Sequence, residues 1–444
     1  MRRTAVLIGT LVGAASFGFA QDTARMDAVV QSYVANGTFS GAVLVARGTE
    51  VVFSKAYGLA DVERKVANTT ATPFRVASIT KQFTAAAILL LAERGRLTLD
   101  DPVKKHLPDA PASWDGMTIL HLLSHTAGFQ GLATPPAARV AIESPDGSID
   151  GFVMQAMRHP LESPPGATFN YTNSGSFILG YLIQKLSGQS YARFIQENIL
   201  TPLGLKDTGL AGAANIGMRA RFYNASPKGP IESALPDRVV PNSAAGFYST
   251  TADLLRWQTA LYGGKVISAA SLEKMTTRSK GDYGLGVYVR RVAGRTVFNH
   301  GGGAPAFANL SYFPDSGTSV AVLGNINVSP GHELAALLGT LAHGQPVTLA
   351  SERKEITLPA EVLARYAGVY QADGGPPLVV AVDGGQLVVR PNNQGSIPLL
   401  AESERMFFIR DLNMQVEFVR DASGAITELT TYQGGRQDRA RRIK

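Results

Sequence analysis

A serine and a lysine three positions apart could act as a nucleophile and its base. Ser78 and Lys81 open a segment, 78–94, whose apolar residues fall at helical spacing. Residues at i and i+3 of a helix share one face, so both side chains would lie on its first turn. The N–H groups of a helix N-terminus favour developing negative charge, which suits a nucleophilic serine.

Lys81 is the lone cation of this apolar run. Burying an ammonium is costly unless it is paired or loses its proton. To act as a base near neutral pH, its pKa must fall by roughly 3 units, or about 4 kcal/mol. The alternative is that Ser78 caps the helix and Lys81 reaches water, and this segment alone leaves both interpretations open.

The same Ser-x-x-Lys spacing occurs twice more, so the spacing by itself is a weak signal. Ser271 and Lys274 belong to a short polar helix, where we expect Ser271 to be the N-cap. Ser351 and Lys354 lie in a charged linker.

Tyr171-Thr172-Asn173 could complete a catalytic group. It follows a Pro-Pro-Gly turn at 164–166 and precedes an expected helix. At such a place the Tyr171 hydroxyl can relay a proton and the Asn173 amide can donate to a substrate carbonyl. An ordinary turn is the alternative.

His300-Gly301-Gly302-Gly303 lies at the end of an expected strand. Three glycines weaken a strand unless something must approach the backbone closely. The N–H groups of Gly303 and Ser78 could then hold an oxyanion, each being worth about 3–4 kcal/mol in the transition state. A bulge or a glycine-rich turn is the alternative.

The composition excludes other chemistries. The chain has no cysteine, which rules out disulfides, a cysteine nucleophile and Cys-ligated zinc or iron–sulfur clusters. His121 and His125 are four residues apart and could share a metal, but no third ligand is evident, so we expect neither a metal nor another cofactor. The net charge of +7 is diffuse and forms no basic stripe with aromatics, so we expect no nucleic-acid partner and a solvated basic tail.

The elements that must position these residues indicate an α+β fold. A β-hairpin is expected over 41–57, mostly helices over 100–260, and strands again from 283, with a helix at 333–341. This order predicts an antiparallel sheet flanked by helices, with a helical insertion. Short strands separated by Gly, Asp and Asn turns then predict a small all-β domain. The expected domains are a signal peptide over 1–20, a main domain over 21–348 and a small β-barrel-like domain over 359–444.

The N-terminus is typical of a secretory signal peptide. Arg2 and Arg3 precede an apolar stretch over 5–20, which ends in the small residues of Gly18-Phe19-Ala20. We therefore expect cleavage and a periplasmic or secreted protein, with a single membrane anchor as the alternative. No other stretch is long and apolar enough to span a bilayer, and the sequence does not determine the oligomeric state.

Together these motifs resemble the serine β-lactamase and penicillin-recognising hydrolase superfamily, in the branch of class C β-lactamases, esterases, DD-peptidases and D-aminopeptidases. The likeness covers about residues 25–343. Besides SITK, YTN and HGG, it rests on further stretches in the order usual for that branch: LLSHTAGF (122–129), PPGATFNYTNSGSFILG (164–180), PLGLKDTGL (202–210), AGFYSTTADLLRW (245–257) and YGLGV (283–287). Tyr366-Ala-Gly-Val-Tyr370 resembles the opening of the lipocalin-like β-domains appended to such hydrolases.

The resemblance assigns roles to the candidate residues. Ser78 would be the acylated nucleophile, Lys81 its base and Tyr171 a partner in proton transfer. Substrate-binding roles would fall to the remaining candidates: Asn173, His300, Gly302 and Gly303.

The resemblance also narrows the class of substrate that we expect. His300 stands where many relatives carry Lys, and Gly301 replaces a Thr or Ser that helps to bind a substrate carboxylate. We therefore expect a small ester, amide or peptide substrate, with an ester or small amide first. A β-lactamase or a D-amino-acid peptidase or DD-peptidase is the alternative, and a non-catalytic protein that binds peptidoglycan fragments is a further one.

Overall fold

The computed structural model describes residues 13–131, 148–211, 218–226, 229–233, 242–303, 307–328, 330–372, 375–391, 395–410, 413–433 and 436–444. They form two compact units. The first comprises Met1–Arg290 and Gly294–Ala342, and the second comprises Arg291–Ala293 and His343–Lys444. The predicted signal peptide lies largely outside the described residues, and helix α1 (Gly13–Ala35) begins within it.

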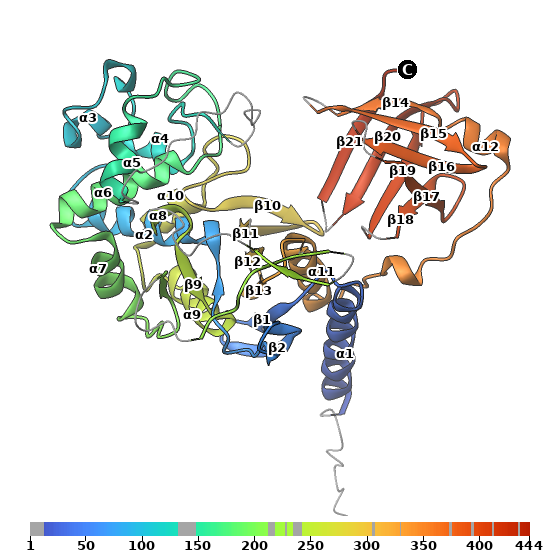
Figure 1. The fold of residues 1–444 in the computed structure, drawn as a ribbon, viewed down its shortest axis with the longest axis horizontal. Coiled ribbons are helices and arrows are strands. Elements are labelled where there is room, and N and C mark those ends of the chain that lie inside the picture. The colour runs from blue at the N-terminus through green and yellow to red at the C-terminus, as the bar shows by residue number, and fades with distance from the viewer. Residues whose placement is uncertain are drawn as a thin grey trace, which may run out of the picture. The chain divides into compact units, whose positions relative to one another are not determined.

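The first unit is built on a six-stranded antiparallel sheet, which confirms the predicted α+β class (Figure 1). Its strands lie in the order β10 (Tyr288–Val292), β11 (Arg295–Gly302), β12 (Ala308–Phe313), β13 (Thr318–Gly324), β1 (Gly41–Arg47) and β2 (Glu50–Tyr57). The central strands β1 and β13 are buried almost throughout. They read as continuous runs of Ala, Val and Leu because both of their faces are covered.

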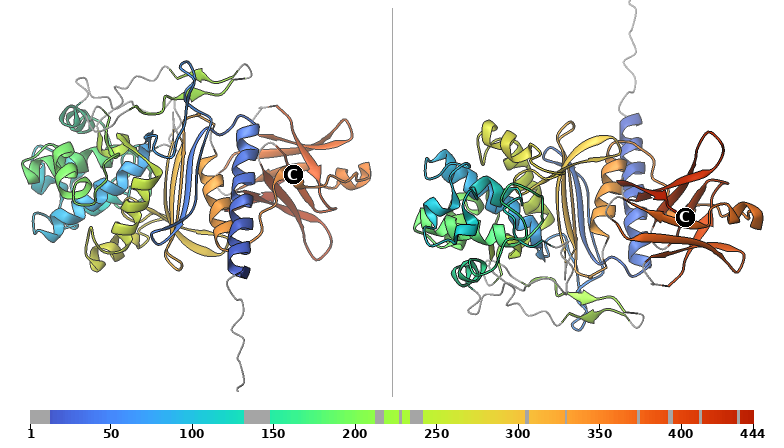
Figure 2. Two further views of the ribbon diagram at one scale, coloured as in Figure 1. Left: turned by 90° about the horizontal axis from the view of Figure 1, so that it is seen from below. Right: turned by 90° about the horizontal axis from the view of Figure 1, so that it is seen from above.

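Helices cover both faces of this sheet (Figure 2). On one face α11 (Gly331–Ala342) packs on β12 and β13, and α1 packs on α11. On the other face α9 (Thr251–Tyr262) packs on β1 and β13. No helix in the described part of the chain has both the length and the apolar run needed to cross a bilayer.

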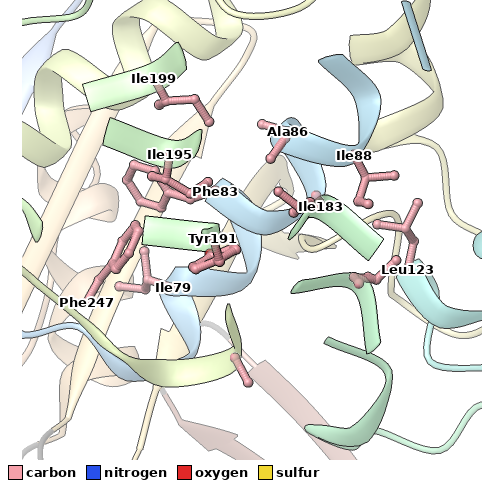
Figure 3. Packing of buried hydrophobic residues seen from close by; sticks show 14 of the residues in the cluster. Ile79, Phe83, Ala86, Ile88, Leu123, Ile183, Tyr191, Ile195, Ile199 and Phe247 are labelled. Carbon is pink, nitrogen blue, oxygen red and sulfur yellow. The ribbon is translucent and has the colours of Figure 1, made fainter. Parts of the chain in front are cut away.

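Helix α2 (Thr80–Glu93) lies at the centre of the helical region. It is buried on nearly all sides, which explains why its sequence is apolar all round. Phe83 stacks on Trp257, with ring centroids 4.0 Å apart, and meets Phe247 edge-on (Figure 3). The other helices of this region are α3 (Val103–His106), α4 (Ile119–Leu123), α5 (Ile149–Ala156), α6 (Ser174–Ser187), α7 (Tyr191–Ile195), the π-helix η4 (Gln196–Leu200), α8 (Asn242–Ala245) and α10 (Ala269–Thr276).

Short strands tie the helical region together. β9 (Phe247–Ser249) pairs with β5 (Phe74–Arg75) and with β6 (Gly209–Leu210). β3 (Leu59–Asp61) pairs with β4 (Val66–Ala67), and β7 (Tyr223–Asn224) pairs with β8 (Ile231–Glu232).

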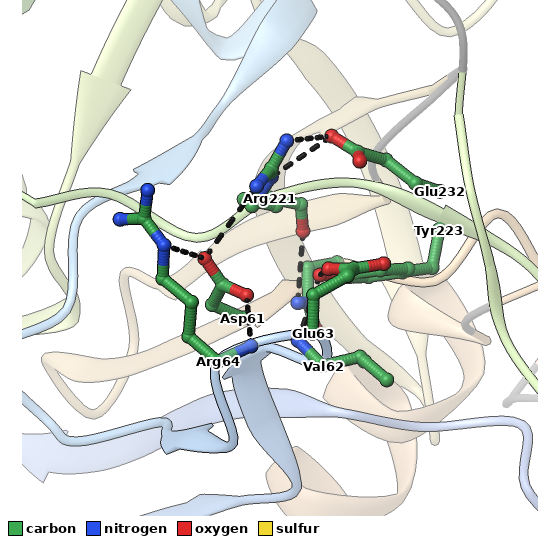
Figure 4. Close-up of polar contacts among 8 residues, drawn as sticks. Asp61, Val62, Glu63, Arg64, Arg221, Tyr223 and Glu232 are labelled. Atoms are coloured by element: carbon green, nitrogen blue, oxygen red, sulfur yellow. Dashed lines mark hydrogen bonds and ion pairs between the residues drawn. The ribbon is translucent and has the colours of Figure 1, made fainter.

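A polar network joins β7 and β8 to the turn after β3 (Figure 4). The Tyr223 hydroxyl donates to Glu63 and accepts the N–H of Val62, both at 2.8 Å. The Arg221 guanidinium lies 3.6 Å from Asp61 and also pairs with Glu232. The network therefore ties the β7–β8 pair to the β3–β4 pair.

Two local expectations were wrong in detail. The N-cap of α10 is Ser268, whose hydroxyl accepts the N–H of Ser271, so Ser271 lies inside the helix. Tyr283 lies in a turn before β10 and not in the strand expected from 283, because it joins the site described below.

The second unit contains a closed antiparallel barrel. Its strands are β14 (Gly368–Gln371), β15 (Pro377–Asp383), β16 (Gln386–Pro391), β17 (Ile397–Ala401), β18 (Met406–Ile409), β19 (Met414–Arg420), β20 (Ile426–Gln433) and β21 (Arg436–Arg442). The short helices η5 (Ala350–Glu352) and α12 (Ala360–Ala364) precede it.

The barrel interior is filled by side chains. Tyr366 and Tyr370, at the start of the predicted β-domain, are fully buried against Phe407 and Phe418. This confirms the predicted all-β domain. The basic tail forms β21, which closes the barrel against β14. Arg439, Arg441 and Lys444 are exposed, as expected, whereas Arg442 is half-buried and donates to four backbone oxygens.

Candidate active site

Ser78 lies in the turn that leads from β5 into α2. The turn η1 (Ala77–Ile79) directly precedes the helix. Ala77 has a φ of +44°, a left-handed conformation that is strained for a residue with a Cβ. The Thr80 hydroxyl holds this turn by donating to the Ala77 carbonyl at 2.6 Å and accepting the Phe247 N–H at 3.2 Å. The surrounding structure therefore fixes the backbone that presents Ser78.

Lys81 is buried, with 2% of its surface exposed, so it does not reach water. Its Nζ lies 3.1 Å from Ser78 Oγ, 2.8 Å from Asn173 Oδ1 and 3.0 Å from the Ala244 carbonyl oxygen. Burial lowers its pKa to about 7. Neither η1 nor α2 has a side-chain cap, so Ser78 is not a helix cap either.

The partners of Lys81 orient its lone pair. An amide oxygen and a backbone carbonyl can only accept hydrogen bonds, whereas a serine hydroxyl can donate one. When Nζ is neutral, its two protons match Asn173 and Ala244. Its lone pair then faces the Ser78 hydroxyl, which is the arrangement of a base and its nucleophile.

Tyr171 completes the contacts of the Ser78 hydroxyl. Its side chain interacts with that of Ser78, and its ring centroid lies 5.1 Å from Lys81 Nζ. Burial raises the pKa of Tyr171. A protonated phenol between a base and a nucleophile can pass a proton on.

Asn173 stands at the N-cap position of α6, but its side chain does not cap that helix. Instead the amide oxygen accepts from Lys81, which leaves the NH2 group as the donor side of the amide. The fold thus gathers Ser78 and Lys81 from one segment and Tyr171 and Asn173 from another that is far along the chain.

His300 is buried under this group and neutral. Its Nδ1–H donates to the Gly301 carbonyl at 2.7 Å, and its Nε2 accepts from the Tyr283 hydroxyl at 3.0 Å. Burial and the neighbouring charge of Lys81 lower its pKa to about 3. Only 1% of the surface of His300 is exposed, so this residue lies in the interior and supports the site through its hydrogen bonds.

The glycines after His300 have different surroundings. A Cβ on Gly302 would lie 2.3 Å from the Val76 carbonyl oxygen, so only glycine lets β11 approach the turn that carries Ser78. A Cβ on Gly301 would lie 2.2 Å from Nε2 of His332, at the start of α11. Among the described residues, a Cβ on Gly303 would meet Phe307 alone, at 3.7 Å.

The rival sequence features have different surroundings. Lys274 and Lys354, the lysines of the other two Ser-x-x-Lys matches, are exposed. His121 and His125 each use Nδ1 to accept a backbone N–H, from Thr118 and Thr172 respectively. The described residues contain no cluster of three or more potential metal ligands.

Sequence analysis missed three contributors to this site. Ala244 acts through its backbone carbonyl and Thr80 through a buried hydroxyl, and neither leaves a signal in the residue type. Tyr283 lies in the YGLGV stretch, whose glycines mark a close approach: a Cβ on Gly286 would lie 2.7 Å from the Lys81 carbonyl oxygen.

Known proteins are similar to this chain in sequence and in fold. Residues 26–343 match the Beta-lactamase family, and residues 352–441 match a domain of unknown function, DUF3471. Penicillin-binding protein 4* of Bacillus subtilis (strain 168) is 28% identical over 438 residues, which cover 91% of this chain and 95% of the relative.

Solved structures of similar fold include an octameric penicillin-binding protein homologue from Pyrococcus abyssi, with a TM-score of 0.69 and 23% identity over 95% of this chain and all of the other. The hydrolase EstCE1, described as having promiscuous acyltransferase activity, has a TM-score of 0.64 and 23% identity over 74% of this chain and 99% of its own. D-amino acid amidase from Ochrobactrum anthropi SV3 has a TM-score of 0.64 and 22% identity over 73% of this chain and 99% of its own.

The family match spans most of the chain and includes every residue of the site. The resemblance drawn from SITK, YTN and HGG is thereby confirmed, and the chain belongs to the β-lactamase family of serine hydrolases.

Proposed function

We propose that this protein hydrolyses an ester or a small amide through an acyl-enzyme on Ser78, outside the cytoplasm and without a cofactor. The observation that carries the proposal is the position of Lys81 Nζ, which is buried, has a pKa of about 7 and lies 3.1 Å from Ser78 Oγ.

Acylation proceeds in two proton steps. Ser78 Oγ attacks the carbonyl carbon, and its proton passes to Lys81 Nζ. The bond from that carbon to the leaving oxygen or nitrogen then breaks, and Tyr171 relays the proton from Lys81 to the leaving group. We assign the oxyanion to the N–H groups of Ser78 and Gly303, and the substrate amide or carbonyl to the Asn173 NH2 group.

Deacylation reverses these roles. A water molecule attacks the acyl carbon, and its proton passes to the neutral Lys81 amine. The Tyr171 hydroxyl can relay it by accepting this proton while it gives its own to Lys81. The bond to Ser78 Oγ breaks, and the proton returns to Ser78.

The substrate choice rests on the end of β11. His300 is neutral and buried, and Gly301 has no hydroxyl, so these two residues offer neither a cation nor a hydroxyl side chain to a substrate carboxylate. An ester or an uncharged small amide suits it best.

A D-amino-acid amide or peptide is the second candidate. It is favoured by the shared fold with D-amino acid amidase from O. anthropi and by the nearly full-length match to a penicillin-binding protein. A β-lactam would use the same acylation step. A non-catalytic protein that binds peptidoglycan fragments remains the third.

Initial rates on three substrates test the proposal: a short-chain p-nitrophenyl ester, a chromogenic cephalosporin and a D-alanine p-nitroanilide. We expect turnover of the ester that disappears in Ser78→Ala and falls steeply in Lys81→Ala and Tyr171→Phe. Ser351→Ala and Lys354→Ala, in the exposed Ser-x-x-Lys, are the matched controls and should keep full activity. Equal rates in wild type and Ser78→Ala, or full activity of both Lys81→Ala and Tyr171→Phe, would refute the mechanism.

Export is tested separately. We propose that residues 1–20 are a signal peptide, on the strength of Arg2, Arg3 and the small residues before Gln21. The mass of the protein recovered from the periplasm or medium should correspond to a chain that begins at Gln21. A full-length chain retained in the membrane would indicate an anchor instead.

A further inference from the structure

The segment that carries Tyr171 is held by the turn after α4. We call residues 162–172 the Tyr171 segment. Along its length it donates backbone N–H groups to that turn: Glu162 to the Gly128 carbonyl at 2.7 Å, Gly166 to the Thr126 carbonyl at 2.7 Å and Asn170 to the His125 carbonyl at 2.8 Å. The position of Tyr171 therefore depends on residues 125–128.

His125 contributes two of the anchors, one on each side of Tyr171. Its carbonyl accepts the N–H of Asn170, and its ring Nδ1 accepts the N–H of Thr172 at 3.3 Å. Because one residue holds both neighbours of Tyr171, the peptide units before and after the tyrosine are fixed together.

The backbone of His125 is bent to make this possible. Its φ is +56°, in the left-handed region where a residue with a Cβ is strained. Strain of this kind persists only where the surroundings enforce it, and it concentrates at functional sites. Here it turns both the carbonyl and the ring of His125 toward the Tyr171 segment.

The ring of His125 also forms the wall behind Tyr171. The two ring centroids are 4.4 Å apart at an angle of 40°, and the Tyr283 ring lies 4.8 Å away on the same imidazole. His125 is 3% exposed, and burial, with the charges of Lys81 and His300, holds its pKa well below its usual range. The imidazole is therefore neutral, so Nδ1 keeps the lone pair that accepts from Thr172.

We propose that His125 is a positioning residue for catalysis: it holds Tyr171 at Ser78 and Lys81 by accepting the Thr172 N–H and by packing on the Tyr171 ring. This inference rests on the proposed function, because it assigns His125 to the proton relay of that mechanism. A displacement of a catalytic group by about 1 Å can cost on the order of 100-fold in rate.

His121 supplies a matched control. It lies on the neighbouring α4, and its Nδ1 likewise accepts a backbone N–H, from Thr118 at 3.2 Å. That bond caps a short helix. The His121 ring also lies near Gly166, where a Cβ would be 3.1 Å from its Nε2, but its hydrogen bond holds neither neighbour of Tyr171. Each histidine is replaced by Phe, which keeps a ring of similar size and removes the acceptor.

Kinetics on the best substrate of the panel give the first test. In His125→Phe we expect kcat to fall by about 10- to 100-fold with KM nearly unchanged, because the substrate site persists while the relay is misplaced. In His121→Phe we expect kcat to stay at the wild-type value even if the thermal midpoint falls. Equal kcat losses in the two variants, or an unchanged kcat in His125→Phe, would overturn the proposal.

A conservative replacement separates positioning from packing. Asn tolerates a positive φ, and its Oδ1 can accept the Thr172 N–H, so His125→Asn should recover most of the kcat lost in His125→Phe. A kcat as low as that of His125→Phe would contradict the role of the acceptor. If His125→Phe does not fold, His125→Gly takes its place, since glycine adopts this φ without strain and also lacks the acceptor.

Amide hydrogen exchange gives a readout without turnover. In a peptide covering Thr172, we expect faster exchange in His125→Phe and near wild-type protection in His125→Asn and His121→Phe. Unchanged protection in His125→Phe would overturn the anchoring. If Ser78→Ala is as active as wild type, the proposed function fails, and the exchange result still decides whether His125 anchors this segment.

Discussion

At the scale of single residues, the acid–base chemistry depends on one buried amine. Lys81 is enclosed by oxygen atoms, two of which can only accept hydrogen bonds. Its neighbours His125 and His300 have pKa values well below their usual range because they are buried. Lys81 is therefore the group of this cluster that titrates near neutral pH.

The pH profile tests this assignment. Lys81 acts as a base only when deprotonated, and its pKa is about 7, so kcat/KM should fall as the pH drops through about 7, with a slope of one proton. The raised pKa of Tyr171 should keep activity from falling on the alkaline side below pH 10. An acid limb at pH 4–5 would instead point to a carboxylate base. Initial rates from pH 5 to pH 10 provide the measurement.

Two adjacent glycines should respond very differently to the same substitution. In Gly302→Ala the new Cβ would lie 2.3 Å from the Val76 carbonyl oxygen, and backbone must move next to Ser78. We expect kcat/KM to fall by about 100-fold and stability by about 1–3 kcal/mol. Gly303→Ala keeps its N–H, and among the described residues its Cβ meets Phe307 alone, so it should lose little in either measurement. Similar losses in the two variants would contradict this account of β11.

At the scale of elements, the turn after α4 and the Tyr171 segment form one unit although they are distant in sequence. Gly128 has a φ of +90°, and its carbonyl accepts the N–H groups of Glu162 and Ser163. A Cβ at this position would lie 2.1 Å from the Ser163 carbonyl oxygen. The contact between these two segments leaves no room for a side chain.

Gly128→Ala should therefore loosen the segment that carries Tyr171. Gly116→Ala is the matched control, because Gly116 also has a positive φ, +77°, but has no atom within 4 Å of a Cβ. Both variants carry the backbone strain of about 1–2 kcal/mol. The free energy of unfolding should fall by about 1–3 kcal/mol more in Gly128→Ala than in Gly116→Ala, and kcat should fall in Gly128→Ala as well. Urea unfolding and initial rates measure the two effects, and equal behaviour of the variants would show that the close contact is unimportant.

At the scale of the whole molecule, the chain divides into two units, each with its own hydrophobic core. The division after Ala342 falls at the end of the first family match, 26–343, and before the second, 352–441. The first core surrounds α2 and so encloses Lys81. The stability of that unit is therefore linked to the protonation of the Lys81 amine.

This linkage has a definite sign. The pKa of Lys81 is about 7 in the folded chain and about 10.4 in the unfolded one, so between these values the unfolded state binds the extra proton and folding becomes more favourable as the pH rises. Below pH 7 the folded protein carries the full cost of a buried ammonium.

Lys81→Met removes this cost. The free energy of unfolding of the variant should exceed that of wild type by the largest amount at pH 6. This difference should be about 2–3 kcal/mol smaller at pH 9 than at pH 6. Urea unfolding of both proteins at the two pH values measures the difference, in which all other titrating groups cancel. A difference that does not change with pH would contradict a lowered pKa of Lys81.

The sequence by itself determined the elements and the identity of the main catalytic candidates. Hydrophobic periodicity is local, so the helix after Ser78, the hairpin at 41–57 and the alternation of strands in the second unit could be predicted from it. Residue types at fixed spacing selected Ser78, Lys81, Tyr171 and Asn173, because few side chains can supply a nucleophile, a base and a relay.

Only the tertiary structure decided how these groups act. Burial by residues far along the chain lowers the pKa of Lys81, and the Ala244 carbonyl and Asn173 amide direct its lone pair to Ser78. Sequence could not distinguish Ser78 as a cap from Ser78 as a nucleophile, nor show that His125 packs on Tyr171 while His121 caps α4. Desolvation and hydrogen-bond direction depend on contacts between distant segments, which local pattern does not contain.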